Sequence, residues 1–409
     1  MTTWLRRLCA LAAGVAMVGC SGLRQSDMPV VASLQPRAAI DVSSVANAYA
    51  FLDLMMDKYA TGSTIRLVQS FDGGGVGNFT DAVTYDDALT IDALLARGSA
   101  DDLARAQVIG DAFLYAQAHD PARDGRLRAA YAPKPFLRPA DVRVTDPTSD
   151  VGNMAWVGQS LVQLYFKTHK PTYLSGASEI ATWILKHAYD KRGAGGYTGG
   201  YTASGMKIRW KSTEHNVDVY AFFSMLAKVT GPYAWLKHAA YAAAFVKAMW
   251  SPKRHRFFAG TGSDGVTPNR TFEPEDVNSW TYLAFADPAW ASALDWNIEH
   301  LSVTAGGFSG VSFCSGDRSG VWFEGTAHLA DALELRDDAG DATKARALLA
   351  DVAYAQSYGP NGDGLGIIAA SKNGLSDCDG DRYYASLHVG ATAWYVMSAS
   401  RVNPLQPLP

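Results

Sequence analysis

Two kinds of helix alternate along this sequence. One kind has an apolar face and an Ala-rich, charged face, which is typical of a helix at the protein surface. Helices of this kind are expected at about 43–59, 101–118, 172–188, 232–250, 288–300 and 339–357. The other kind is apolar nearly all round, which indicates a buried helix, and its members begin near residues 86, 153, 214, 278, 324 and 388. Two-residue alternation is confined to Leu67–Ser70, Tyr197–Tyr201 and Arg256–Phe258, so the sequence predicts an all-α fold with small strands in its loops.

The repeat of one buried and one surface helix predicts a closed double ring. The last buried helix ends near Ala399 with no surface helix after it, and the helix at 43–59 can fill that position. We therefore expect an (α/α)6 toroid, also called a six-hairpin barrel, over residues 41–402. The connections into the buried helices are long, and long loops in a compact domain are usually functional. All of them, with the polar starts of the buried helices, are expected at one end of the ring.

The first twenty residues have the layout of a secretory signal. Two arginines precede a short apolar run over residues 8–18, and Gly19-Cys20 follows. The run Met17-Val18-Gly19-Cys20-Ser21 resembles the bacterial lipobox, which implies that 1–20 is a lipoprotein signal peptide and that Cys20 carries lipid. Residues 21–40 are rich in small and polar residues and are interpreted as a tether. The sequence thus predicts an exported cell-envelope lipoprotein, in the periplasm or at the outer membrane, held to a membrane by its N-terminal lipid.

The remaining cysteines and the charge limit the possible partners. Cys314 and Cys378 are expected to form a disulfide in an oxidising compartment, the alternative being two unpaired buried thiols. Neither has a His or Cys at metal-ligand spacing, and the acidic run 377–381 does not complete an EF-hand, so no metal is expected. The chain has 36 basic and 40 acidic residues without a basic stripe, which argues against nucleic acid. No nucleotide-binding fingerprint occurs, so no cofactor is expected, and we expect a monomer.

Four short motifs at the starts of buried helices suggest a family. They are Tyr85-Asp86, the run Ser212-Thr213-Glu214-His215-Asn216, the run Trp322-Phe323-Glu324-Gly325, and Leu387-His388-Val389-Gly390-Ala391-Thr392. Together with the alternating hairpins they resemble the six-hairpin glycosidase superfamily over about residues 43–400. The resemblance implies a carbohydrate substrate. It does not fix the reaction, because that architecture serves glycoside hydrolases, polysaccharide lyases and sugar epimerases alike.

The carboxylic acids at the buried-helix starts are the candidates for catalysis. Glycoside hydrolysis commonly needs one protonated carboxyl group as acid and one ionised group as base or nucleophile. We expect Glu214 to be the acid, because the apolar helix that follows it should raise its pKa. The alternative is that Glu214 caps the helix. Asp86 and Glu324 are both candidates for the base, since each follows an aromatic residue, Tyr85 or Trp322, that can stack on a sugar.

Other polar and aromatic residues near the same helix starts are expected to bind substrate, although aromatic rings at such positions are often core. His388 could instead serve as a base in an epimerase or lyase. The expected substrate-binding residues are Asp72, Tyr85, Trp156, His215, Asn216, Trp280, Trp322 and His388.

Three functions remain open, with hydrolysis of an oligo- or polysaccharide as the leading hypothesis. A lyase acting on uronates would need basic residues in the cleft, and Lys207, Arg209 and Lys211 lie just before Glu214. An epimerase on the same fold would use a histidine or tyrosine to remove a carbon-bound proton. A non-catalytic glycan-binding lipoprotein would need aromatic rings but not several carboxylates in one cleft.

Overall fold

The computed structural model describes residues 42–231 and 233–408. The predicted signal peptide, the tether and the lipid-bearing Cys20 lie outside these residues. Within them, no helix is both long enough and apolar enough to cross a membrane.

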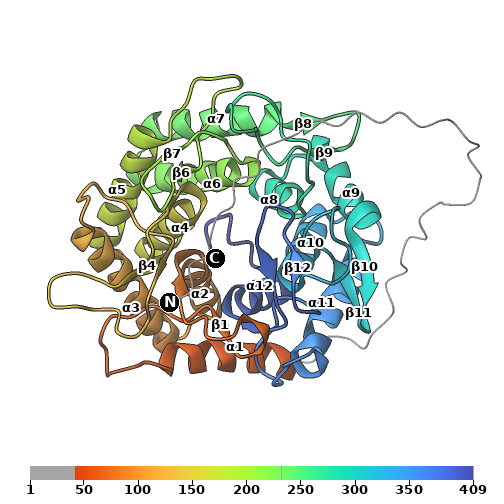
Figure 1. The fold of residues 1–409 in the computed structure, drawn as a ribbon, viewed down its shortest axis with the longest axis horizontal. Coiled ribbons are helices and arrows are strands. Elements are labelled where there is room, and N and C mark those ends of the chain that lie inside the picture. Colours follow the sequence, from red (N-terminus) through yellow and green to blue (C-terminus); the bar gives the residue numbers. More distant parts are fainter. Residues whose placement is uncertain (1–41, 232, 409) are drawn as a thin grey trace, which may run out of the picture. The chain divides into compact units, whose positions relative to one another are not determined.

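Helices dominate the described residues and form two concentric rings (Figure 1). The inner ring contains α2 (Thr84–Arg97), α4 (Val151–Thr168), α6 (Thr213–Thr230), α8 (Asp276–Phe285), α10 (Phe323–Arg336) and α12 (Val389–Ala399). The outer ring contains α1 (Val42–Asp57), α3 (Ala100–His119), α5 (Pro171–His187), α7 (Tyr233–Ala248), α9 (Ser292–Leu301) and α11 (Asp341–Tyr358). Each inner helix packs on the next, and α12 packs on α2, so the inner ring is closed. The prediction of an (α/α)6 toroid is confirmed.

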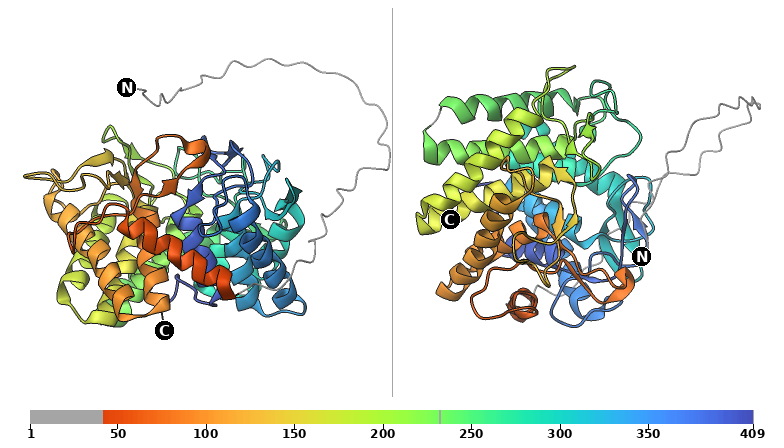
Figure 2. Two further views of the ribbon diagram at one scale, coloured as in Figure 1. Left: turned by 90° about the horizontal axis from the view of Figure 1, so that it is seen from below. Right: turned by 60° about the vertical axis from the view of Figure 1, so that its left-hand side comes forward.

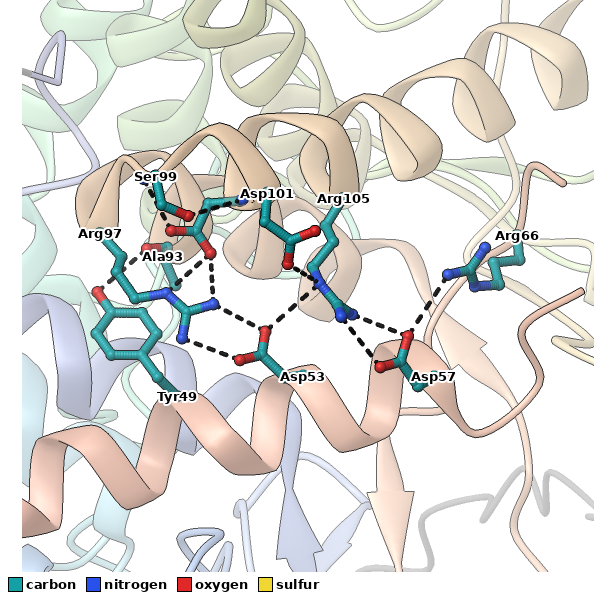
Figure 3. Close-up of polar contacts among 10 residues, drawn as sticks. Tyr49, Asp53, Asp57, Arg66, Ala93, Arg97, Ser99, Asp101 and Arg105 are labelled. Atoms are coloured by element: carbon teal, nitrogen blue, oxygen red, sulfur yellow. Dashed lines mark hydrogen bonds and ion pairs between the residues drawn. The ribbon is translucent and has the colours of Figure 1, made fainter. Parts of the chain in front are cut away.

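Helix α1 completes the ring as expected, because it packs on α12. Two arginines tie α1 to the neighbouring hairpin (Figure 3). Arg97 Nη2 lies 2.8 Å from Asp53 Oδ1, and Arg105 Nη1 lies 2.9 Å from Asp57 Oδ1. An isolated exposed ion pair contributes little, but a network with bidentate arginines holds two helices in one register.

The inner helices end at one side of the ring, and the last described residues cover that side. Gln163 of α4 donates to the carbonyl oxygen of Gln406 and accepts from the main-chain N–H of Leu408. Asn403 and Gln406 donate to main-chain carbonyls at the end of α8. The long loops lie at the other side (Figure 2). The last described residues therefore cover one end of the ring, and the loops surround the other end.

Short strands stiffen the loops. They are β1 (Phe71–Asp72), β2 (Ala82–Val83), β3 (Ala130–Tyr131), β4 (Val144–Asp146), β5 (Ser149–Asp150), β6 (Gly200–Tyr201), β7 (Lys207–Ile208), β8 (Trp250–Ser251), β9 (Arg256–Phe257), β10 (Ser302–Ala305), β11 (Phe308–Val311), β12 (Leu375–Ser376), β13 (Arg382–Tyr383) and β14 (Leu387–His388). Strands β6 and β9 fall within predicted segments.

The strand predicted over residues 67–70 is wrong. The main-chain N–H of Val68 donates to the Asp87 carboxylate, 2.7 Å away, instead of to a neighbouring strand. Pairing begins one residue after the predicted segment, where β1 runs antiparallel to β14 and places Phe71 opposite His388. This pairing brings a loop before α2 against the start of α12.

A disulfide joins two of the long loops. Cys314, in the loop before α10, is bonded to Cys378, in the loop before α12. The bond lies next to the β12–β13 hairpin, in which Leu375 pairs with Tyr383. It fixes this hairpin over the starts of the inner helices.

Candidate active site

A pocket of about 290 Å³ opens at the loop end, beside the starts of α6 and α8. Glu214 and Asp276 line it from these two helices. The loops add apolar wall from Trp210, Phe272 and Phe313. Two carboxyl groups and aromatic surface in one concave site fit a sugar, whose ring has polar edges and an apolar face.

Glu214 does not cap α6. The N-cap is Ser212, whose hydroxyl accepts from the main-chain N–H of His215, and the Thr213 hydroxyl donates to the carbonyl of Phe258. The carboxyl group of Glu214 is thus left for the pocket. Burial and then the nearby Asp276 carboxylate raise the pKa of Glu214 well above its usual value, which favours the protonated form.

Asp276, the first residue of α8, is the second acid of the pocket. Its side chain is buried, and its Oδ1 atom has no hydrogen-bond partner among the described residues. Burial and the adjacent Glu275 raise the pKa of Asp276 to about 7. The protonation state of this group therefore changes near neutral pH, and with it the potential felt by Glu214.

Glu324 has the opposite electrostatic setting. Burial alone would raise its pKa, but His328, His388 and Tyr85 together hold the pKa below its usual value. Tyr85 donates its hydroxyl proton to Oε1 over 2.6 Å, while His328 Nε2 lies 3.7 Å from Oε1 and His388 Nδ1 lies 3.4 Å from Oε2. Glu324 is consequently ionised in the folded protein.

His388 lies between two carboxylates. Its Nε2 atom is 3.3 Å from Asp86, and its ring stacks on Phe71 with the ring centroids 4.2 Å apart. Although burial opposes the charged form, Asp86 and Glu324 raise the pKa of His388. The Nδ1 atom also accepts from the N–H of Ala391, which makes His388 the N-cap of α12. Asp86 thus orients His388, and neither Asp86 nor Glu324 is among the residues that line the pocket.

Four predicted substrate-binding residues form the interior wall behind the carboxyl groups. Trp156 and Trp280 pack edge to face, and Tyr85 lies within 6.0 Å of both rings. Trp322 packs on Phe313 of the pocket wall. The three tryptophans are each at most 3% exposed, so they support the site and present little ring surface to a ligand.

The other predicted substrate-binding residues differ in their positions. His215 lines the pocket, with its ring near Trp210. Asn216 is fully buried, and its amide bonds to the main chain of Tyr197 at both ends, so it holds a loop and does not face a ligand. Asp72 is half-buried, is paired with Lys58 at 2.8 Å, and is not among the residues that line the pocket.

Sequence reasoning missed several residues of the site. His328 lies one helical turn after Glu324 and within 3.4 Å of Glu275, and these two carboxylates raise the pKa of His328 to about 9 against the effect of burial. Its position four residues after Glu324 was a usable signal. Tyr383 and Trp394 had no such signal, because neither lies one helical turn from a candidate acid in the sequence.

The described residues contain no group of three His, Cys, Asp or Glu side chains arranged to hold a metal ion.

Comparisons with known proteins agree with this architecture. No protein-family model and no curated protein matches the sequence. Among solved structures, a cellobiose 2-epimerase from Bacillus thermoamylovorans matches with a TM-score of 0.64 at 10% identity, covering 88% of this chain and 98% of that one. A glycosidase in complex with glucose matches with a TM-score of 0.62 at 13% identity, covering 90% and 100%. A family 76 glycoside hydrolase (mannosidase) from Bacteroides thetaiotaomicron matches with a TM-score of 0.57 at 13% identity, covering 89% and 98%. The chain therefore has the (α/α)6 toroid fold of the six-hairpin glycosidases.

Proposed function

We propose that this protein is a glycoside hydrolase in which Glu214 is the general acid and Glu324 is the base or nucleophile. One observation carries the proposal: burial and Asp276 raise the pKa of Glu214, whereas His328, His388 and Tyr85 hold the pKa of Glu324 below its usual value. Acid and base catalysis at one glycosidic bond requires such a pair, with one carboxyl group protonated and the other ionised. Of the two candidate bases, Glu324 is preferred over Asp86, because His328, His388 and Tyr85 hold the pKa of Glu324 below its usual value.

In the proposed reaction, Glu214 gives its proton to the departing glycosidic oxygen. Glu324 either takes a proton from the attacking water or attacks the anomeric carbon directly. Tyr85 keeps Glu324 ionised and oriented through its hydrogen bond. Asp276 is a positioning residue in this scheme, since its charge sets the proton affinity of Glu214.

The direct test combines a Glu214→Gln variant with oligosaccharide hydrolysis in oxygen-18 water. The wild type is expected to release fragments with the heavy oxygen at the new reducing end, and the variant is expected to lose at least about 100-fold in turnover. Glu179→Gln, an exposed change on α5, is the matched control. Near-wild-type turnover by Glu214→Gln with an unchanged melting temperature would refute the assignment.

Epimerisation is the second candidate, favoured by the contact of His388 with Asp86 at the mouth of the barrel. An imidazole beside a carboxylate can move a carbon-bound proton. In deuterium oxide an epimerase would place deuterium on the sugar carbon without cleaving the chain. Mass spectrometry of the products in the two labelled solvents therefore separates epimerisation from hydrolysis.

The structure gives a lyase less support. Of the three basic residues that precede Glu214, only Lys211 lines the pocket. Its ammonium group donates to the carbonyl of Arg192 and lies 3.6 Å from Asp190 Oδ1. Lys207 and Arg209 are exposed. The pocket therefore lacks the available cations that a uronate would need.

Export, lipid attachment at Cys20 and a monomeric chain remain predictions from the sequence. A hydrolase anchored in the cell envelope would act on an extracellular or envelope glycan.

A further inference from the structure

An acidic loop forms one wall of the pocket. Asp377 and Asp379, from the loop between β12 and β13, line the same pocket as Glu214 and Asp276. Two acidic residues therefore face the candidate catalytic carboxyl groups from a part of the chain that the proposed hydrolysis does not use.

This loop is rigidly held. The Oδ1 atom of Asp377 accepts from the main-chain N–H groups of Asp379, Gly380 and Asp381, at 2.9, 3.0 and 2.9 Å. The residue between the two pocket acids, Cys378, is bonded to Cys314. The carboxylates are consequently fixed beside the pocket, and a ligand meets them without reordering the loop.

The cation on the pocket lining does not balance these charges. Lys211 is 1% exposed, and its ammonium group is already bonded to Arg192 and close to Asp190. Asp276, 4% exposed, adds a carboxyl oxygen that has no partner among the described residues. A buried polar atom without a partner is costly, and a donor on a ligand would satisfy it.

Tyr383, on β13, is near acids of both the loop and the barrel. After burial, the carboxylates that raise its pKa are those of Glu324, Asp276, Asp377 and Glu214. The loop carboxylate and ionised Glu324 thus act on the same side chain and give this region a negative field, to which Glu214 in its protonated form does not contribute. In a narrow cleft such a field raises the local concentration of cations.

We infer that the pocket selects a glycan with free, protonated amino groups, such as an oligomer of glucosamine, over its N-acetylated or uronate counterparts. The inference rests on the proposed function for the position of the sugar, and it adds the substrate class. Asp377, Asp379 and Asp276 supply the acceptors for the ammonium group, and the Trp210 and Phe313 rings supply apolar surface for the sugar.

Binding to the full chain carrying Glu214→Gln tests the inference without turnover. The probes are a glucosamine tetramer, its fully N-acetylated form and a uronate tetramer, measured by calorimetry at about pH 6, where primary amines are protonated. We expect the glucosamine tetramer to bind about tenfold more tightly than the N-acetylated one. Raising the salt to about 0.5 M should reduce this preference.

Two further substitutions locate the effect. Adding Asp379→Asn should reduce the preference for the amine about threefold to tenfold, because it removes one pocket charge. Asp337→Asn, an equal change of charge at the exposed C-cap of α10, should leave the preference unchanged.

The outcomes separate this inference from the proposed function. Equal or tighter binding of the N-acetylated or uronate tetramer, or no binding of the glucosamine tetramer, would overturn the inference while hydrolysis of a neutral glycan by the wild type would still support the hydrolase. A salt-dependent preference for the amine without any cleavage by the wild type would uphold the inference and overturn the hydrolase.

Discussion

Tyr85 donates its hydroxyl proton to Glu324 over 2.6 Å, although 239 positions separate the two residues in the chain. The same hydroxyl oxygen accepts from the indole N–H of Trp394, 2.8 Å away. Three inner helices thus meet at one tyrosine. Burial and the Glu324 carboxylate raise the pKa of Tyr85 well above its usual value, so Tyr85 remains a donor at every pH at which the protein would act.

Replacing Tyr85 with Phe tests this relationship. Loss of the hydrogen bond should raise the pKa of Glu324, because Tyr85 is one of the groups that lower it. Turnover should fall about 10- to 100-fold, and the acidic limb of the pH–rate profile should move to higher pH. The exposed change Tyr358→Phe is the control. An unshifted acidic limb would show that Tyr85 does not act through Glu324.

Removing the charge of Asp276 should move the basic limb of the same profile. Hydrolysis needs protonated Glu214, so activity is lost as the pH rises through the pKa of Glu214. The Asp276 carboxylate raises that pKa, so Asp276→Asn should lower it and shift the basic limb to lower pH. A shift in the other direction, or a change in turnover alone with no shift, would contradict the assigned role.

His328 predicts a pH dependence of stability. Its folded-state pKa of about 9 lies above the ordinary value of 6.5. The resulting stabilisation is complete below pH 6.5 and is lost as the pH rises through 9, with a size of about 1–3 kcal/mol. Melting temperatures measured between these pH values should therefore fall less in His328→Gln than in the wild type. His300→Gln, on the exposed end of α9, should behave as the wild type does.

The disulfide should contribute to stability as well as to the pocket wall. A bond between cysteines 64 positions apart reduces the conformational entropy of the unfolded chain, which destabilises the unfolded state by about 4 kcal/mol on the chain-entropy estimate. The double change Cys314→Ser and Cys378→Ser should lower the unfolding free energy by about 2–4 kcal/mol in denaturant titrations. Treatment of the wild type with a reductant should have the same effect and should leave the double variant unaffected.

Substitution of Asp92, in the middle of α2, is expected to increase the free energy of unfolding. It is fully buried, neither carboxyl oxygen has a partner among the described residues, and burial raises its pKa well above the usual value. The unfolded chain ionises this group above about pH 4, so its contribution to stability falls as the pH rises. Asp92→Asn should therefore gain about 1–3 kcal/mol at high pH and less at low pH. Equal stability of the two proteins across the pH range would show that the native site already satisfies the carboxyl group.

The helices could be predicted from the sequence because their signal is local. The all-round apolar character of α6 and the amphipathic pattern of α3 are present in single stretches of chain. The closure of α1 onto α12 followed from counting the helices. In contrast, the segment at 67–70 has the alternation of a strand, yet Val68 bonds to Asp87, a side-chain contact that no local pattern announces.

The residue types of the site were more predictable than their roles. Glu214 and Glu324 could be selected from the sequence because they are acids at the starts of apolar helices. The raised pKa of Glu214 followed from its apolar helix, but the lowered pKa of Glu324 could not be predicted, because it depends on Tyr85, His328 and His388, which only the fold brings together. Asn216 shows the converse: it lies within the motif, but its amide is used by the loop at Tyr197, which only the folded chain brings there.

The sixth hairpin of the ring, α12 with α1, is assembled from opposite ends of the described chain. Five other hairpins are continuous in sequence, whereas this one has its connection missing and still packs in the same way. A peptide linker from the last described residues, which stay in place against α4 and α8, to the start of α1, combined with a new opening at the exposed turn near Gly340, is therefore expected to give a circular permutant with every helix pair retained. Such a permutant would show that any hairpin of the ring can begin the chain.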